Sequence, residues 1–130
     1  MLRRSFLILT GAAGVKCVAG EPIKALSLEI HSYEDAVELA KDSGSRIYVL
    51  FVGDRCKWCD QQKTVMIDPK VVNGLKSYLV VYANVSKDKD LTKKHGVRIV
   101  PTHLVIDEYG DSIKKFAGYQ NVDDFLRWLD

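Results

Sequence analysis

The chain has 130 residues, of which 47% are hydrophobic and 28% are charged, and its formal net charge is +2. These values exclude a disordered or fibrous protein and predict a single globular domain with an ordinary core. No continuous apolar segment reaches the roughly 20 residues that a transmembrane helix requires.

The first 20 residues have the pattern of an export signal. Arg3 and Arg4 form a basic start, residues 5–15 are mostly apolar or small, and residues 17–20 supply small side chains for cleavage. We therefore divide the chain into an export signal at residues 1–20 and a domain at residues 21–130. The predicted location is periplasmic or otherwise exported.

The route of export stays open at this point. Residues 3–7, Arg-Arg-Ser-Phe-Leu, resemble the twin-arginine motif, although Leu2 and Ile8 depart from its fuller consensus. An uncleaved N-terminal anchor is an alternative interpretation. A lipoprotein is a weaker one, because Lys16 stands directly before Cys17, where a small residue is expected.

Removal of residues 1–20 changes both the charge and the cysteine count. It takes away three basic residues and leaves 16 basic and 17 acidic ones, a net charge of −1. No basic stripe with interleaved aromatic residues remains, so nucleic acid is not an expected partner. Cys56 and Cys59 are then the only thiols, and an exported domain with a single close pair is better suited to redox chemistry than to stapling.

From residue 25 onward, strand-like and helix-like segments alternate. Strands are predicted at residues 25–30, 47–52, 79–85, 102–107 and 112–116. Helices are predicted at residues 33–42, 56–67, 70–77 and 91–95, and after the capping residue Asn121. This order predicts an α/β fold with a central mixed sheet of four to five strands that is flanked by helices.

The segment with the clearest chemistry is Cys56-Lys57-Trp58-Cys59. It follows a continuous apolar run, Ile47–Val52, and a turn at residues 53–55, so it falls at the start of a helix. Sulfurs at positions i and i+3 share one face of a helix and can form a disulfide with little backbone movement. Cys56 is then the exposed member of the pair and Cys59 the sheltered one.

The position of Cys56 also favours its ionised form. A helix N-terminus carries partial positive charge and free N–H groups, which stabilise a thiolate, and Arg55 and Lys57 add to this effect. Because the thiolate is the reactive form in disulfide exchange, we predict that Cys56 is the nucleophile and Cys59 the resolving thiol.

Two close cysteines are also compatible with other sites. A CxxC pair can be half of a zinc site or a structural disulfide. The histidines that could complete a zinc site, His31, His95 and His103, show no paired spacing, and there is no second CxxC. We therefore predict no metal, and we expect these histidines to be solvent-facing or partly buried.

A second segment, Gly96-Val97-Arg98-Ile99-Val100-Pro101-Thr102, identifies the family. Together with the CxxC helix, Gly118 and the final amphipathic helix, it resembles thioredoxin-fold proteins in content and order from about residue 25 to residue 130. The resemblance implies that Pro101 is cis and that the backbone of Val100 receives an extended substrate segment by strand addition. It implies no cofactor other than the Cys56–Cys59 disulfide itself.

The chain departs from thioredoxins at several positions. The buried acid that assists the resolving thiol aligns with Leu50, its lysine partner with Tyr82, and the tryptophan before the first cysteine with Arg55. The proton acceptor for Cys59 is therefore unassigned. Trp58 is either a contact for substrates, alongside Val100 and Pro101, or an aromatic side chain that packs on the helix start.

These observations predict an exported thiol–disulfide oxidoreductase. The favoured function is reduction of protein disulfides, with the dithiol recharged by a membrane electron carrier and the protein acting as a monomer. One alternative is an oxidant or isomerase of the same fold, because Lys57-Trp58 is not the dipeptide of thioredoxin. Another is a non-catalytic binding protein or chaperone that uses the surface around Val100 and Pro101.

Overall fold

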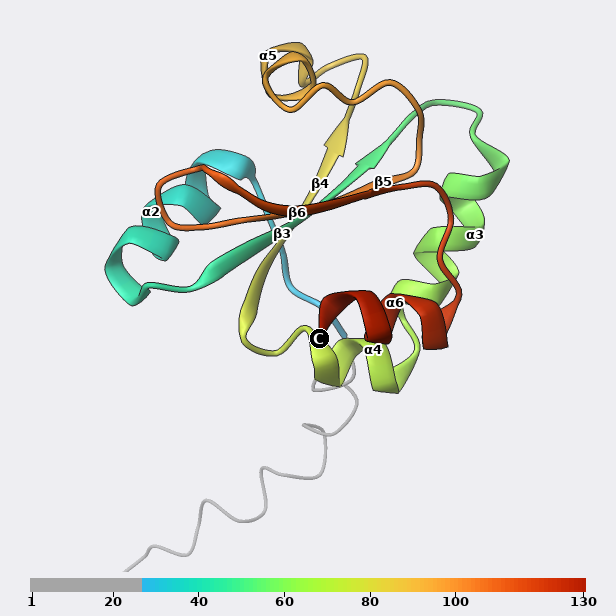
Figure 1. Cartoon of the computed structure of the whole chain (residues 1–130), viewed down its shortest axis with the longest axis horizontal. Helices are drawn as coiled ribbons and strands as arrows, with labels where there is room; N and C mark the ends of the chain where they lie inside the picture. The colour runs from blue at the N-terminus through green and yellow to red at the C-terminus, as the bar shows by residue number, and fades with distance from the viewer. Residues whose placement is uncertain (1–26) are drawn as a thin grey trace, which may run out of the picture.

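The computed structural model describes residues 27–130, and these form one mixed sheet with helices on both faces (Figure 1). The predicted export signal at residues 1–20 lies outside the described residues. The strands are β2 (Ile30–His31), β3 (Arg46–Val52), β4 (Tyr78–Asn84), β5 (Thr102–Ile106) and β6 (Ser112–Ala117). The helices are α2 (Tyr33–Ser43), α3 (Lys57–Met66), α4 (Pro69–Gly74), α5 (Lys89–Lys94) and α6 (Val122–Leu129).

The sheet has five strands in the order β2-β4-β3-β5-β6. β4 pairs in parallel with both β2 and β3, whereas β5 pairs antiparallel with both β3 and β6. This confirms the predicted fold class. The central strand β3 has neighbours on both edges and helices over both faces, so residues 47–52 are all buried, as their continuous apolar sequence indicated.

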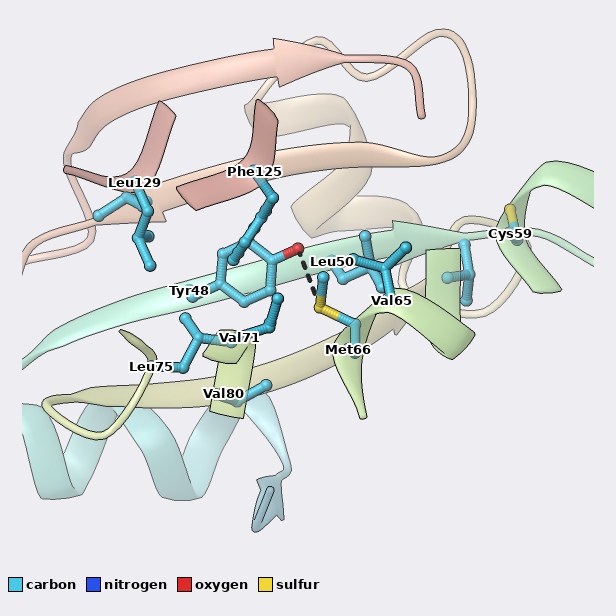
Figure 2. Packing of buried hydrophobic residues seen from close by; sticks show 12 residues of the cluster. Tyr48, Leu50, Cys59, Val65, Met66, Val71, Leu75, Val80, Phe125 and Leu129 are labelled. Atoms are coloured by element: carbon cyan, nitrogen blue, oxygen red, sulfur yellow. Dashed lines mark hydrogen bonds between the residues drawn. The ribbon is translucent and has the colours of Figure 1, made fainter. Parts of the chain in front are cut away.

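Two hydrophobic clusters lie on opposite faces of the sheet. On one face Tyr48, Leu50 and Val52 pack against residues of α3, α4 and α6 (Figure 2). On the other face Ile47, Val49 and Phe51 pack against α2 and α5. The alternation of side chains along β3 therefore divides one apolar run between two cores. Figure 1 shows α2 on one side of the sheet and α3, α4 and α6 on the other.

The predicted ends of the helices are largely confirmed. Ser32, Asp68 and Asn121 each accept a backbone N–H at the start of α2, α4 and α6. Gly44 ends α2 in the left-handed conformation, with φ of 71°. One prediction needs shortening: α4 ends at Gly74 rather than Ser77, because Leu75 turns into the core and the chain enters β4 at Tyr78.

The first strand also differs from its predicted range. Within the described residues β2 contains only Ile30 and His31, at the edge of the sheet beside β4. Over residues 27–130 no helix has both the length and the apolar character needed to cross a membrane.

Candidate active site

The two cysteines lie where β3 gives way to α3 and are joined by a disulfide. Cys56 occupies the N-cap position of α3, and its sulfur accepts the backbone N–H of Cys59 at 3.1 Å. The two Cα atoms are 5.1 Å apart, within the usual range for a disulfide. Cys59 is 1% exposed, as predicted, whereas Cys56 is half-buried rather than exposed but remains the more accessible of the two.

A sharp turn brings Cys56 to this position. Arg55 adopts φ of 52° and is the only residue other than glycine with positive φ in residues 27–130. Its left-handed backbone redirects the chain out of the sheet, after which Cys56 is extended and the helix begins. The side chains of Arg55 and Lys57 are both exposed, so solvent and salt weaken their effect on a thiolate at Cys56.

The segment before β5 faces the disulfide. The Val100–Pro101 peptide bond is cis, as the family resemblance implied. The carbonyl oxygen of Val100 lies 3.9 Å from the sulfur of Cys56, and the carbonyl oxygen of Pro101 accepts the N–H of Gly118 at 2.8 Å. The predicted site residue Cys56 therefore meets Val100 and Pro101, which follow it by more than 40 positions, at one end of the sheet.

An open apolar pocket of about 290 Å³ lies beside this segment. It is lined by Trp58, Ile99, Val100, Pro101, Gly118 and Tyr119. Trp58 is 56% exposed, and its ring centroid is 5.3 Å from that of Tyr119. Trp58 thus both packs against a neighbour and offers apolar surface to solvent. Ile99, Gly118 and Tyr119 complete this pocket and were not among the predicted site residues.

Within residues 27–130, no buried carboxylate takes the place of the thioredoxin acid near Cys59. Leu50 is fully buried and lies opposite Tyr82 in the pairing of β3 with β4. Burial raises the pKa of Tyr82 to about 12, so its hydroxyl remains protonated near neutral pH. The buried polar side chains among residues 27–130 are Gln62, Thr102, His103 and Gln120, and none of these is acidic.

A buried polar network lies behind the CxxC helix and was missed by the sequence analysis. His103 is 0% exposed, which contradicts the expectation of a solvent-facing or partly buried side chain. Its Nδ1 lies 2.7 Å from the hydroxyl of Tyr48, and its Nε2 lies 3.2 Å from Oε1 of Gln62 and 3.1 Å from the carbonyl oxygen of Gly118. His103 is buried because it points from the central part of the sheet toward α3 and α6.

The partners of this network fix its protonation pattern. Carbonyl oxygens can only accept hydrogen bonds, so the proton of neutral His103 is on Nε2, and Nδ1 accepts from the hydroxyl of Tyr48. Gln62 accepts the backbone N–H of Gln120 at 2.8 Å and donates to the carbonyl oxygen of the same residue at 2.9 Å. These two contacts identify which amide atom of Gln62 is oxygen and which is nitrogen.

The other two histidines are partly exposed, in line with the prediction. Residues 27–130 contain no cluster of three or more His, Cys, Asp or Glu side chains arranged to hold an ion.

The geometry defines the class of protein. A CxxC disulfide at a helix start, facing a cis-proline at the end of a mixed five-stranded sheet, is the site of a thiol–disulfide oxidoreductase. The model of the thioredoxin-like domain family matches residues 33–130. The chain therefore belongs to the thioredoxin-like domain family.

Solved structures share this fold. A thioredoxin from Thermus thermophilus superposes with a TM-score of 0.70 at 25% identity, covering 79% of this chain and 85% of its own. A DsbH oxidoreductase gives a TM-score of 0.68 at 21% identity, covering 77% of this chain and 79% of its own. A poplar thioredoxin h gives 0.63 at 16% identity, with 74% and 84% covered. A search of the curated proteins finds no match.

The buried histidine makes stability depend on pH. Burial lowers the pKa of His103 from 6.5 to about 4, although its hydrogen bond to Gly118 acts in the opposite direction. Between these values the unfolded chain binds more protons than the folded one. Neutral His103 therefore contributes to the free energy of unfolding in full above about pH 6.5. This contribution, about 3 kcal/mol in total, is lost as the pH falls toward about 4.

Urea denaturation of the oxidised protein at several pH values in this window tests the prediction. Other groups titrate in the same range, so the informative quantity is the free energy of unfolding of the wild type minus that of His103→Gln. We expect this difference to shrink as the pH falls. A difference that stays constant from about pH 7 to about pH 4 would contradict a neutral, buried His103.

Proposed function

We propose that the protein is an extracytoplasmic thiol–disulfide oxidoreductase that reduces protein disulfides through a Cys56/Cys59 cycle. The observation that supports this most directly is the arrangement of the pair, with a half-buried Cys56 beside the Val100 carbonyl and a sheltered Cys59 one turn along the helix. One thiol can therefore meet a substrate while the other is kept for the second step.

The cycle begins with the reduced pair. The thiolate of Cys56 attacks one sulfur of a substrate disulfide, the substrate S–S bond breaks, and the other substrate sulfur leaves as a thiolate and takes up a proton. Cys59, deprotonated, then attacks the sulfur of Cys56 and releases the second substrate thiolate. Two electrons pass from the protein to the substrate, and the Cys56–Cys59 disulfide remains to be reduced by a dithiol donor.

The substrate is held beside the cis-proline. An extended segment lying along Val100 would place its sulfur next to Cys56, because the Val100 oxygen is only 3.9 Å from the Cys56 sulfur. The adjoining pocket would take an apolar side chain of that segment between Trp58 and Tyr119. Trp58, Val100 and Pro101 are therefore our candidates for substrate binding.

The exposure of the nearby cations supports a reducing rather than an oxidising pair. A strongly oxidising dithiol requires a strongly stabilised thiolate in the reduced form. Here Cys56 accepts one backbone N–H, and the proposed thiolate-stabilising residues Arg55 and Lys57 are exposed, where their influence is screened. The N-cap position of Cys56 is the observation that favours the second candidate, an oxidant or isomerase.

The resolving thiol, Cys59, must lose its proton without a buried carboxylate to accept it. Since no carboxylate is buried within residues 27–130, we assign this role to water or to the leaving substrate thiolate. The thiolate is the better placed of the two, because it is formed beside the Cys56 sulfur in the preceding step. Proton transfer is then coupled to the arrival of substrate.

Export and recharging complete the proposal. The basic and apolar pattern of residues 1–20 supports passage across a membrane, by the general or the twin-arginine route. Outside the cytoplasm a reductant needs electrons from within the cell, so we propose a membrane electron carrier as the partner that reduces the Cys56–Cys59 disulfide. We further propose that the protein works as a monomer.

Replacement of Cys59 should trap the substrate. With Cys59→Ser, Cys56 can still attack but the mixed disulfide cannot be resolved, so we expect a stable covalent complex with a peptide disulfide and loss of turnover by at least about a hundredfold. Mass spectrometry of the non-reduced complex measures this. Cys56→Ser is the matched control and should form no complex. Trapping by Cys56→Ser but not by Cys59→Ser would reverse the two roles.

The reduction potential decides the direction of the reaction. Equilibration in graded dithiothreitol or glutathione buffers, followed by trapping of free thiols, should give a midpoint near or below about −270 mV for a reductant. A midpoint near about −120 mV would instead support the oxidant. A wild-type pair that does not cycle at all would leave a non-catalytic binding protein.

Export can be tested with a reporter. Residues 1–20 fused to an enzyme that is active only outside the cytoplasm should give activity in a bacterial host, because the segment supplies the charge and apolar stretch that export requires. Replacement of Arg3 and Arg4 together by lysine should abolish it for the twin-arginine route and spare it for the general one. Absence of activity with both fusions would refute the extracytoplasmic location.

A further inference from the structure

Four separate backbone segments form the active site. They are the end of β3, the start of α3, the cis-proline segment before β5, and residues 118–120 after β6. Pairing of β5 with β3 and β6, together with the hydrogen bond from Gly118 to Pro101, fixes three of these segments relative to one another. The start of α3 meets them at the surface through an apolar pocket with one exposed tryptophan and through a 3.9 Å approach between the Val100 oxygen and the Cys56 sulfur. The position of α3 relative to the end of the sheet therefore depends on contacts beneath the surface.

The buried polar network joins the elements that carry these four segments. Tyr48 belongs to β3, Gln62 lies on α3 three residues beyond Cys59, and His103 lies on β5 two residues beyond Pro101. The fourth segment takes part through its backbone, since Gly118 accepts from His103 and Gln120 makes two hydrogen bonds with Gln62. Gln62, His103 and residues 118–120 thus lie within three positions of a site residue, whereas Tyr48 lies in the middle of β3, eight positions before Cys56.

The hydrogen bonds of the network are directional, unlike the apolar contacts around them. The side chain of Gln62 is 0% exposed and is held at both amide atoms by the backbone of Gln120. This paired contact fixes the rotation of α3 about its axis and its height relative to residues 118–120. His103 joins both elements to β5, since its Nε2 lies within hydrogen-bonding distance of Gln62 and Gly118.

We propose that Gln62 and His103 are positioning residues for disulfide exchange. They hold the CxxC helix against the cis-proline segment and residues 118–120, so that the Cys56 sulfur stays aligned with the apolar pocket beside the cis-proline. The inference rests on the proposed function, because it concerns the reaction of Cys56 with an extended substrate. A misalignment of about 1 Å at a reacting centre can reduce a rate by about a hundredfold.

Two substrates distinguish positioning from mere stability. A peptide disulfide with an apolar residue beside its cysteine uses both Cys56 and the apolar pocket, whereas hydroxyethyl disulfide requires Cys56 alone. We divide the second-order rate constant for the peptide disulfide by that for hydroxyethyl disulfide. Both are measured for the reduced full-length protein under conditions where each variant is folded. A residue that only stabilises the fold leaves this ratio unchanged.

Gln62→Leu removes both contacts with the backbone of Gln120 and should lower the ratio by about tenfold. His103→Asn and His103→Gln form a second, matched pair. An asparagine amide reaches the position of Nδ1, toward Tyr48, while a glutamine amide reaches that of Nε2, toward Gln62 and Gly118. We expect His103→Asn to lower the ratio about tenfold and His103→Gln to restore it to within about twofold of the wild type.

Val71→Ala is the control for destabilisation. Val71 is fully buried in α4 and packs in the same core, but it takes no part in the network. It should leave the ratio at the wild-type value. If Gln62→Leu does not fold, the two His103 variants decide alone.

The outcomes separate this inference from the proposed function. A wild type that reacts with both disulfides, together with variants whose ratio stays within about twofold of it, overturns the positioning role and leaves the proposed function intact. An equal fall for Val71→Ala overturns it in the same way. A wild type that reduces neither disulfide refutes the proposed function and this inference with it.

Discussion

The central strand β3 is the constraint on which the rest of the structure depends. It pairs in parallel with β4 and antiparallel with β5, and its side chains enter both cores. Because its neighbours on both edges and both faces are fixed, the residue that follows it has a defined position and direction. The turn at Arg55 then sets Cys56 at the start of α3 and opposite the Val100–Pro101 peptide, which directly precedes β5, the antiparallel neighbour of β3. The site is thus a consequence of how the sheet ends.

Much of this arrangement could be predicted from local patterns. The apolar run of residues 47–52, the turn at residues 53–55 and the two cysteines three positions apart determine where the helix begins and which sulfur is sheltered. Caps at Ser32, Asp68 and Asn121 mark helix starts because their side chains bond within their own turn. The cis state of Pro101 came from family resemblance alone, since its neighbours in sequence do not determine it.

The buried network could not be predicted in the same way. His103 meets its partners Tyr48 and Gln62 across 55 and 41 positions of sequence, and no local rule joins them. One signal was nevertheless present. Gln62 lies on the helix face that also carries Cys59 and Met66, and His103 lies within the apolar strand Thr102–Ile106. Buried polar groups need hydrogen-bond partners, so two polar residues that each lie on an apolar face of the same chain indicate that they bind each other.

The shelter of Cys59 also affects how the site responds to peroxide. Cys56 is the thiol that solvent-borne oxidants can reach, and its first oxidation product is a sulfenic acid. A second thiol one helical turn away condenses with that group and expels water, which yields the same disulfide that the exchange reaction forms. Accidental oxidation therefore returns the protein to the disulfide state of its cycle. Further oxidation to the irreversible sulfinic and sulfonic acids must compete with attack by Cys59, which is already in place.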